Sequence, residues 1–235
     1  MALAQQQNLD LASVMVRLRC ESFWEKLLIP AFVFFFELLY PFSWVNDPTR
    51  PTAAAAGGCI LIRRAALERI DGLQQIRQAL IDDCALAAAI QASEGRIWLG
   101  LSDQTHSLRT YPNLKTIWDM VARTAFTQLE YSWILLIATI FGMLLVYLVP
   151  ISSFATGLLL GHYWLAGVGG FGWGLITFAY WPTIRFYRLS PVWAMALPGI
   201  ALLHTLMTLD SALRYWQGKG GAWKGRVYPG RKSRA

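Results

Sequence analysis

The stretch DDCALAAAIQASEGRIWLGLS, residues 82 to 102, decides the fold class of this 235-residue chain. Its alanine-rich part predicts a helix over 82 to 95, with Gly95 at the C-terminal end. RIWLGLS, 96 to 102, alternates apolar residues with others and predicts a strand. Upstream, AGGCILIRR at 56 to 64 predicts a glycine turn and a short buried strand, followed by a helix that ends near Gly72. This strand–helix–helix–strand order predicts an α/β fold.

Asp82 and Asp83 open the predicted helix, and the local sequence leaves three roles for them: helix cap, metal site or catalytic base. An aspartate before a helix satisfies free N–H groups, and negative charge is favoured at that end. A cap needs one carboxylate, so the second is unexplained. We expect a carboxylate near a helix start to be kept ionised, which suits a base. No histidine lies near in sequence, so a Ser-His-Asp arrangement has no support.

The composition is that of a membrane protein or a membrane-attached one: 55% of the residues are hydrophobic and 15% are charged. Residues 131 to 184 contain no Asp, Glu, Lys or Arg, which is long enough for two spans of about 20 residues. We expect spans at 132 to 150 and 157 to 182, broken near Pro150. A further apolar stretch at 189 to 209 predicts a third span, or a re-entrant hairpin broken at Pro198-Gly199. The glycines of the second span predict tight helix packing.

An aromatic segment, LLIPAFVFFFELLYPF at 27 to 42, is interrupted by Pro30 and Glu37 and is too short between charges to span a bilayer. It predicts a helix in the headgroup region, with a buried core helix as the alternative. Residues 113 to 131 predict an amphipathic helix that leads into the first span. The sequence predicts four parts. They are interfacial helices at 1–44, an α/β part with a membrane-proximal helix at 45–130, a transmembrane region at 131–210 and a basic tail at 211–235.

The net charge of +7 is concentrated near the end of the chain, where six of the 21 basic residues lie in the last 17 positions. A basic tail after apolar segments predicts binding to anionic lipid headgroups in the bilayer, and we expect no nucleic-acid partner. The three cysteines form no CxxC pair, and the three histidines share no ligand spacing, so neither a disulfide framework nor a metal site is expected in this chain.

Read in order, GGCILIRRAAL, LIDDCALA and GRIWLGL resemble the second half of a family 2 glycosyltransferase catalytic domain. In that family a glycine turn and strand end in arginine, and an acidic pair then opens a helix as ED-x-x-L. Asp83-Cys84-Ala85-Leu86 is similar to the D-x-x-L part, and Asp82 takes the place of the glutamate. The flanking MVRLRCESFWEKLLIPAFVFFF, YPFSWVNDP and MVARTAFTQLEYS resemble the hopanoid (hopene-associated) subfamily of bacterial membrane proteins.

The resemblance implies a partial GT-A-like (Rossmann-like) catalytic domain followed by about three transmembrane or re-entrant helices in a multi-pass protein of the bacterial inner membrane, with its catalytic part cytoplasmic. It implies inverting transfer from a nucleotide sugar to a lipid acceptor, linked to hopanoid biosynthesis, with Asp83 as base. The residues that it implies for the site are Asp83 and Asp82 for catalysis, and Gly57, Gly58, Arg63, Arg64 and Arg123 for substrate.

This sequence departs from the family pattern in two places. No DxD occurs, so the nucleotide-binding half and its Mg²⁺ or Mn²⁺ ligands are expected outside this chain, as if it were the C-terminal part of a longer enzyme. Of the membrane-proximal (Q/R)xxRW motif, Arg123 alone is retained. The alternatives are an inactive remnant or non-enzymatic membrane scaffold, and a small transporter, which the absence of charge in the long apolar stretches disfavours.

Overall fold

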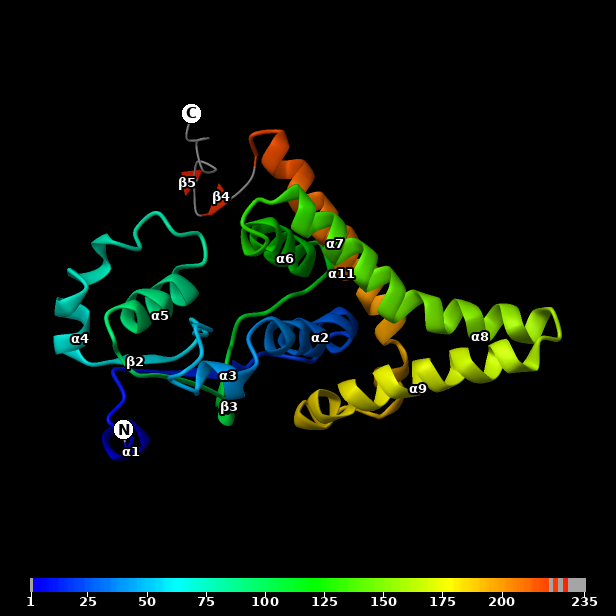
Figure 1. The fold of residues 1–235 in the computed structure, drawn as a ribbon, viewed down its shortest axis with the longest axis horizontal. Coiled ribbons are helices and arrows are strands. Elements are labelled where there is room, and N and C mark those ends of the chain that lie inside the picture. The colour runs from blue at the N-terminus through cyan, green and yellow to red at the C-terminus, as the bar shows by residue number, and fades with distance from the viewer. Residues whose placement is uncertain (1, 220–221, 224–225, 228–235) are drawn as a thin grey trace. The chain divides into compact units, whose positions relative to one another are not determined.

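The computed structural model describes residues 2–219, 222–223 and 226–227 (Figure 1). The chain divides into two compact units. The first, Met1–Arg19 with Phe35–Thr110, holds the sheet and is called the sheet unit. The second, Cys20–Phe34 with Tyr111–Ala235, is called the helical unit. The units meet after residues 19, 34 and 110, which differs from the predicted boundaries after residues 44 and 130, and α2 (Phe23–Leu39) contributes residues to both units.

The sheet unit has the predicted α/β character, with one small sheet of three strands in the order β2-β1-β3. Its central strand β1 runs antiparallel to β2 and parallel to β3, with Leu11 opposite both Ile62 and Ile97. α5 lies along one face of the sheet (Figure 1). The remaining elements of this unit, with its strands, are α1 (Ala2–Gln6), β1 (Leu11–Arg17), α3 (Phe42–Val45), β2 (Ile60–Ile62), α4 (Arg64–Arg69), the 3-10 turn η1 (Gly72–Gln74), α5 (Asp82–Ala92) and β3 (Ile97–His106).

The central strand corrects the expectation that residues 1 to 44 form interfacial helices, because Leu11–Arg17 is a strand. Leu11, Ser13 and Met15 alternate as buried positions along it. The Ser13 hydroxyl donates to the carbonyl of Ala56 at 3.0 Å and accepts from the Ala56 N–H at 2.7 Å. The strand is fixed by pairing with two distant segments, which no local pattern encodes.

The predicted helix and strand of the deciding stretch are both present, as α5 and β3. The helix ends at Ala92, where Glu94 takes a left-handed φ of 62°. The Gly95 N–H donates to the Ile90 carbonyl at 2.9 Å, and a Cβ on Gly95 would lie 2.7 Å from that oxygen. Gly95 therefore serves a close backbone approach at the helix end, and the left-handed position belongs to its neighbour.

The helical unit contains the first part of α2 and the helices that follow residue 110. Its α6 packs along α11 around Phe126, Leu136 and Ala212. The Phe126 N–H donates to the Ser211 hydroxyl at 3.0 Å, which ties the two helices at their centre. The elements after residue 110 are α6 (Leu114–Gln128), α7 (Trp133–Met143), the π-helical segment η2 (Leu144–Leu148), α8 (Val149–Leu159), α9 (Tyr163–Phe186), α10 (Val192–Met195), α11 (Leu197–Trp216) and the antiparallel pair β4 (Ala222–Trp223) and β5 (Arg226–Val227).

The expected break near Pro150 is wrong, since α7, η2 and α8 run on from Trp133 to Leu159 as one 27-residue helix. Proline lacks an N–H, and the wider π-helical turn just before it accommodates the lost hydrogen bond. The chain reverses instead at Gly161, which has a φ of 71°. α8 and α9 then lie side by side as an antiparallel hairpin (Figure 1).

Among the described residues, one helix is long and apolar enough to cross a membrane, and it is Trp133–Leu159. Of the three expected spans, one is therefore supported among the described residues. α9 has the length but interrupts its apolar residues with many glycines. α11 buries one face, against α6, and Pro198 stands in its first turn, where proline is tolerated, so no hairpin breaks there.

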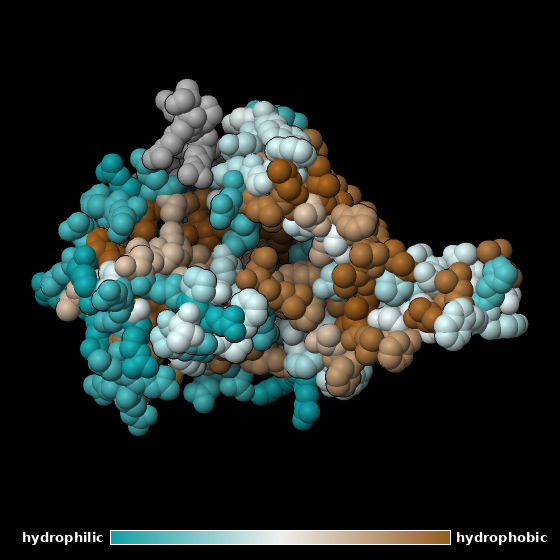
Figure 2. Space-filling view, viewed as in Figure 1, coloured by the Kyte–Doolittle hydropathy of each residue, from teal (hydrophilic) through white to brown (hydrophobic). Residues whose placement is uncertain are grey.

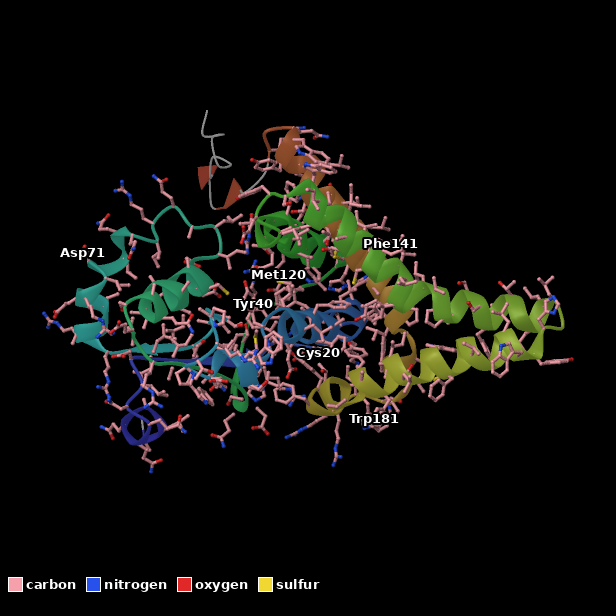
Figure 3. All side chains as sticks on the ribbon, viewed as in Figure 1. Cys20, Tyr40, Asp71, Met120, Phe141 and Trp181 are labelled. Atoms are coloured by element: carbon pink, nitrogen blue, oxygen red, sulfur yellow. The ribbon has the colours of Figure 1, made fainter. Side chains whose placement is uncertain are left out.

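The helical unit exposes large apolar side chains along α7, α8 and α9, and Figure 2 shows hydrophobic residues gathered over α7 and the adjoining part of α11. Phe141, labelled in Figure 3, is 65% exposed. Glycines join α8 to α9, as predicted for tight packing: a Cβ on Gly157 would lie 2.3 Å from the Ala166 nitrogen, and one on Gly169 would lie 2.4 Å from the Phe154 nitrogen.

Candidate active site

The acidic pair lies in the first turn of α5, which begins at Asp82. One carboxylate oxygen of Asp83, Oδ1, accepts from the Cys84 N–H at 2.8 Å. The other, Oδ2, accepts from the Gly57 N–H at 2.7 Å. Asp82 is exposed, and its Oδ1 accepts from the Asp83 N–H at 3.1 Å. Both aspartates therefore satisfy first-turn N–H groups, and Asp83 alone also reaches a second segment.

That second segment is the turn at Gly57 and Gly58, before β2. A Cβ on Gly57 would lie 3.1 Å from Asp83 Oδ2, and one on Gly58 would lie 2.7 Å from Val16 Cγ2. The two glycines let the turn approach both the carboxylate and the central strand. The structure thus brings together Gly57, Gly58 and Asp83, which the sequence placed in one site.

Burial raises the pKa of Asp83, hydrogen bonds from the Cys84 and Gly57 N–H groups lower it in part, and the charge of Asp82 raises it further. The net direction is upward. This is opposite to the expectation that the helix start keeps the carboxylate ionised, because removal of water outweighs the two N–H groups. A carboxylate with a raised pKa is a stronger proton acceptor once it is ionised.

The neighbouring thiol has no comparable chemistry. Burial raises the pKa of Cys84 to about 12, the charge of Asp83 adds to the effect, and a hydrogen bond from Tyr40 offsets it in part. Its Sγ lies 3.5 Å from the Ala55 carbonyl oxygen. Figure 3 labels Tyr40, which belongs to the same sheet unit. Since only a thiolate is nucleophilic, Cys84 is a packing residue.

The predicted arginines lie elsewhere. Arg63 precedes α4 and is exposed, and its backbone N–H donates to the Asp10 carbonyl at 2.9 Å. The side chain of Arg64 is 92% exposed and pairs with Glu68 at 2.8 Å. Within the described residues, neither guanidinium contacts Asp83. Arg123 lies on α6 in the helical unit, whereas Asp82 and Asp83 belong to the sheet unit.

A polar cleft of about 640 Å³ opens in the sheet unit beside α4 and the end of α5. Arg69, Asp71, Gln74, Arg77 and Ser93 line it together with apolar atoms, and Asp83 is not part of its wall. Asp71, labelled in Figure 3, lies in the turn after α4 with a φ of 56°. Both arginines have local partners: Arg69 is 3.5 Å from Asp10, and Arg77 is 3.4 Å from Gln74.

The expected divalent metal has no ligand set here. Over residues 2–219, 222–223 and 226–227, no group of three or more His, Cys, Asp or Glu side chains could hold a metal ion.

Sequence motifs did not identify one carboxylate, Glu25, that has the features of a functional residue. Glu25 is fully buried in the first turn of α2 in the helical unit. Its Oε2 accepts from the N–H groups of Glu21 at 3.0 Å and Ser22 at 2.9 Å, and its Oε1 accepts from the Tyr111 N–H at 2.8 Å. The Ser22 hydroxyl accepts from the Glu25 N–H at 3.2 Å. The S-x-x-E spacing of Ser22 and Glu25 is the sequence signal of this capping box.

Compared with models of protein families, with curated proteins and with solved structures, the chain matches none of them.

Proposed function

We propose that this chain is the acceptor-side part of a membrane-attached glycosyltransferase, which transfers a sugar from a nucleotide-sugar donor to a hydroxyl of a lipid, in or near hopanoid biosynthesis. Its membrane is the bacterial inner membrane, with the sheet unit in the cytoplasm. The family 2 resemblance of GGCILIRR and LIDDCALA supplies the reaction class. Donor binding and the metal are assigned to a GT-A-like nucleotide-binding part outside these residues.

The observation that best supports this proposed function is the position of Asp83. Its carboxylate is partly buried at a helix start, two backbone N–H groups fix it, and its pKa is raised. Each oxygen accepts one N–H, so lone pairs remain for a proton. A general base needs a fixed orientation and a pKa moved toward the working pH, and Asp83 has both.

The reaction balances with Asp83 as the only group of this chain that moves a proton. The acceptor hydroxyl oxygen forms a bond to the anomeric carbon of the sugar, and its proton passes to a carboxylate oxygen of Asp83. The bond from the anomeric carbon to the phosphate oxygen breaks, and the nucleoside diphosphate leaves with the electron pair. Attack opposite to the leaving group inverts the anomeric carbon. Burial is the largest cause of the raised pKa of Asp83, and the charge of Asp82 adds to it.

The lipid acceptor is supported by the helical unit. The helix Trp133–Leu159 has a mean hydropathy of 2.7 in its most apolar window, and only 11% of that window is buried. A soluble helix of this composition would bury most of its surface. Anchoring by this helix holds the chain where lipid headgroups present their hydroxyls.

The test is glycosyl transfer by membranes that contain the full chain, supplied with radiolabelled nucleotide sugars and extracted bacterial lipid, with and without a co-expressed nucleotide-binding part. We expect Asp83→Asn to reduce transfer by about 10²- to 10⁴-fold, the usual contribution of a general base. Asp82→Asn, one residue away and exposed, is the matched control and should keep most of the activity. Equal activity of Asp83→Asn and the parent would exclude Asp83 as base.

The exposed apolar surface of α7 to α9 favours one other function, a non-enzymatic membrane interaction protein. That function predicts membrane binding by the full chain and no transfer from any donor, even with the nucleotide-binding part present. The same assay therefore separates the two.

A further inference from the structure

The helical unit contains an apolar groove of about 500 Å³. Its floor comes from the start of α11 and its sides from the start of α2, from α8 and from α10. The residues that line it include Phe23, Trp24, Ile151, Met195, Gly199 and Leu203. The volume is in the range of pockets that bind small molecules. Every lining side chain is apolar apart from the indole of Trp24, so the groove selects a ligand without hydrogen-bonding groups.

One wall of the groove belongs to the membrane-crossing candidate. Ile151 lies in the helix Trp133–Leu159, whose outer surface is exposed and apolar. The groove is thus continuous with the surface that would contact hydrocarbon in a bilayer. Water in it would find no polar partners, whereas a lipid chain from the surrounding bilayer would keep its apolar environment.

Aromatic contacts shape the rim. The rings of Phe23 and Trp193 lie 5.7 Å apart, and those of Phe23 and Trp24 lie 5.2 Å apart. The Trp173 indole N–H donates to the Met195 carbonyl at 3.1 Å, so the carbonyl of this lining residue already has a donor. Aromatic rings at such a position are typical of the membrane interface.

We propose that this groove holds one hydrocarbon chain of a bilayer lipid. The inference rests on the membrane location and not on sugar transfer, so it stands or fails separately from Asp83. Gly199 gives access to it, since a Cβ at this exposed helical position would meet nothing within 4 Å. The Cβ of a substituted residue therefore fits at the groove wall without displacing the backbone. Gly174 on α9 is the matched control: it is also exposed and helical, its Cβ would also meet nothing, and it does not line the groove.

The experiment uses the full chain in nanodiscs of phosphatidylcholine and phosphatidylglycerol with a trace of phosphatidylcholine that has a diazirine in its acyl chain. After irradiation, labelled peptides are quantified by mass spectrometry, with no sugar donor present. We expect labelling around Met195 and Leu203 to exceed labelling around Phe141 on the open face of α7. Gly199→Phe should lose this enrichment, and Gly174→Phe should keep it.

Thermal unfolding of each variant checks its fold, and Gly199→Leu with Gly174→Leu replaces the phenylalanine pair where a variant does not accumulate. Enrichment that survives both Gly199 substitutions would overturn the proposal. So would groove labelling no stronger than that at Phe141, or cross-links from the groove to a second copy of the chain in place of lipid.

Discussion

Two carboxylates at helix starts, Asp83 in the sheet unit and Glu25 in the helical unit, contrast in what surrounds them. Glu25 is completely buried and accepts from three backbone N–H groups, one of them 86 residues away. Asp83 is partly exposed and accepts from two. Glu25 therefore satisfies the backbone donors of two segments, while Asp83 is a fixed carboxylate that keeps some exposed surface.

The contrast shows that the role of a carboxylate at a helix start depends on the lone pairs that remain available and on its exposure to solvent. Glu25 has no exposed surface, so its role is to satisfy backbone donors. Asp83 keeps some contact with solvent, and burial raises its pKa. Substitutions at the two sites should separate stability from chemistry.

The largest effect is expected for Glu25→Ala. It leaves the N–H groups of Glu21, Ser22 and Tyr111 without their acceptor, and we expect the free energy of unfolding to fall by about 3 kcal/mol. Chemical denaturation of the purified chain in detergent measures it. Ser22→Ala removes the reciprocal cap and the 3.4 Å hydrogen bond from the Ser22 hydroxyl to the Tyr111 carbonyl, and it should cost about 1 kcal/mol. If Glu25→Ala were as stable as the parent, the structural role assigned to the hydrogen bonds of Glu25 would be wrong.

A smaller effect is expected for Gly57→Ala. The added Cβ would lie 3.1 Å from Asp83 Oδ2, so the carboxylate must shift and its 2.7 Å hydrogen bond must lengthen. We expect a loss of about 1 kcal/mol, the usual net worth of one hydrogen bond. Hydrogen exchange at the amide of residue 57 should become faster than in the parent. Unchanged exchange would show that this bond does not fix Asp83.

The smallest effect is the pH dependence that Asp83 contributes to stability. Because its pKa is raised in the folded state, the protonated carboxyl stabilises the fold, and this stabilisation is complete below the unfolded pKa of about 3.9. It is lost as the pH rises through the folded pKa. The difference in unfolding free energy between the parent and Asp83→Asn should therefore move in favour of the variant as the pH rises from about 4. A difference that moved the other way would mean that the N–H groups outweigh burial.

The acidic pair, its glycine turn and the α5–β3 order could be predicted because each depends on residues close in sequence. The role of Glu25 could also have been found, from the S-x-x-E spacing of Ser22 and Glu25, although its contact with Tyr111 could not. Arg63, Arg64 and Arg123 were placed by resemblance alone; Arg64 pairs with Glu68, and Arg123 lies on α6 in the helical unit. Side-chain direction and packing decide such groupings, and neither is visible in a linear motif.

The sequence by itself determined the α/β character of the sheet unit and the existence of a long apolar helix after residue 131. Both follow from local propensity, from the period of apolar residues and from the absence of charge. Tertiary structure alone decided that Leu11–Arg17 is the central strand, that the helix continues through Pro150 to Leu159, and that α11 packs along α6. These outcomes depend on hydrogen bonds and close contacts between segments far apart in sequence, whose free energies override local preference.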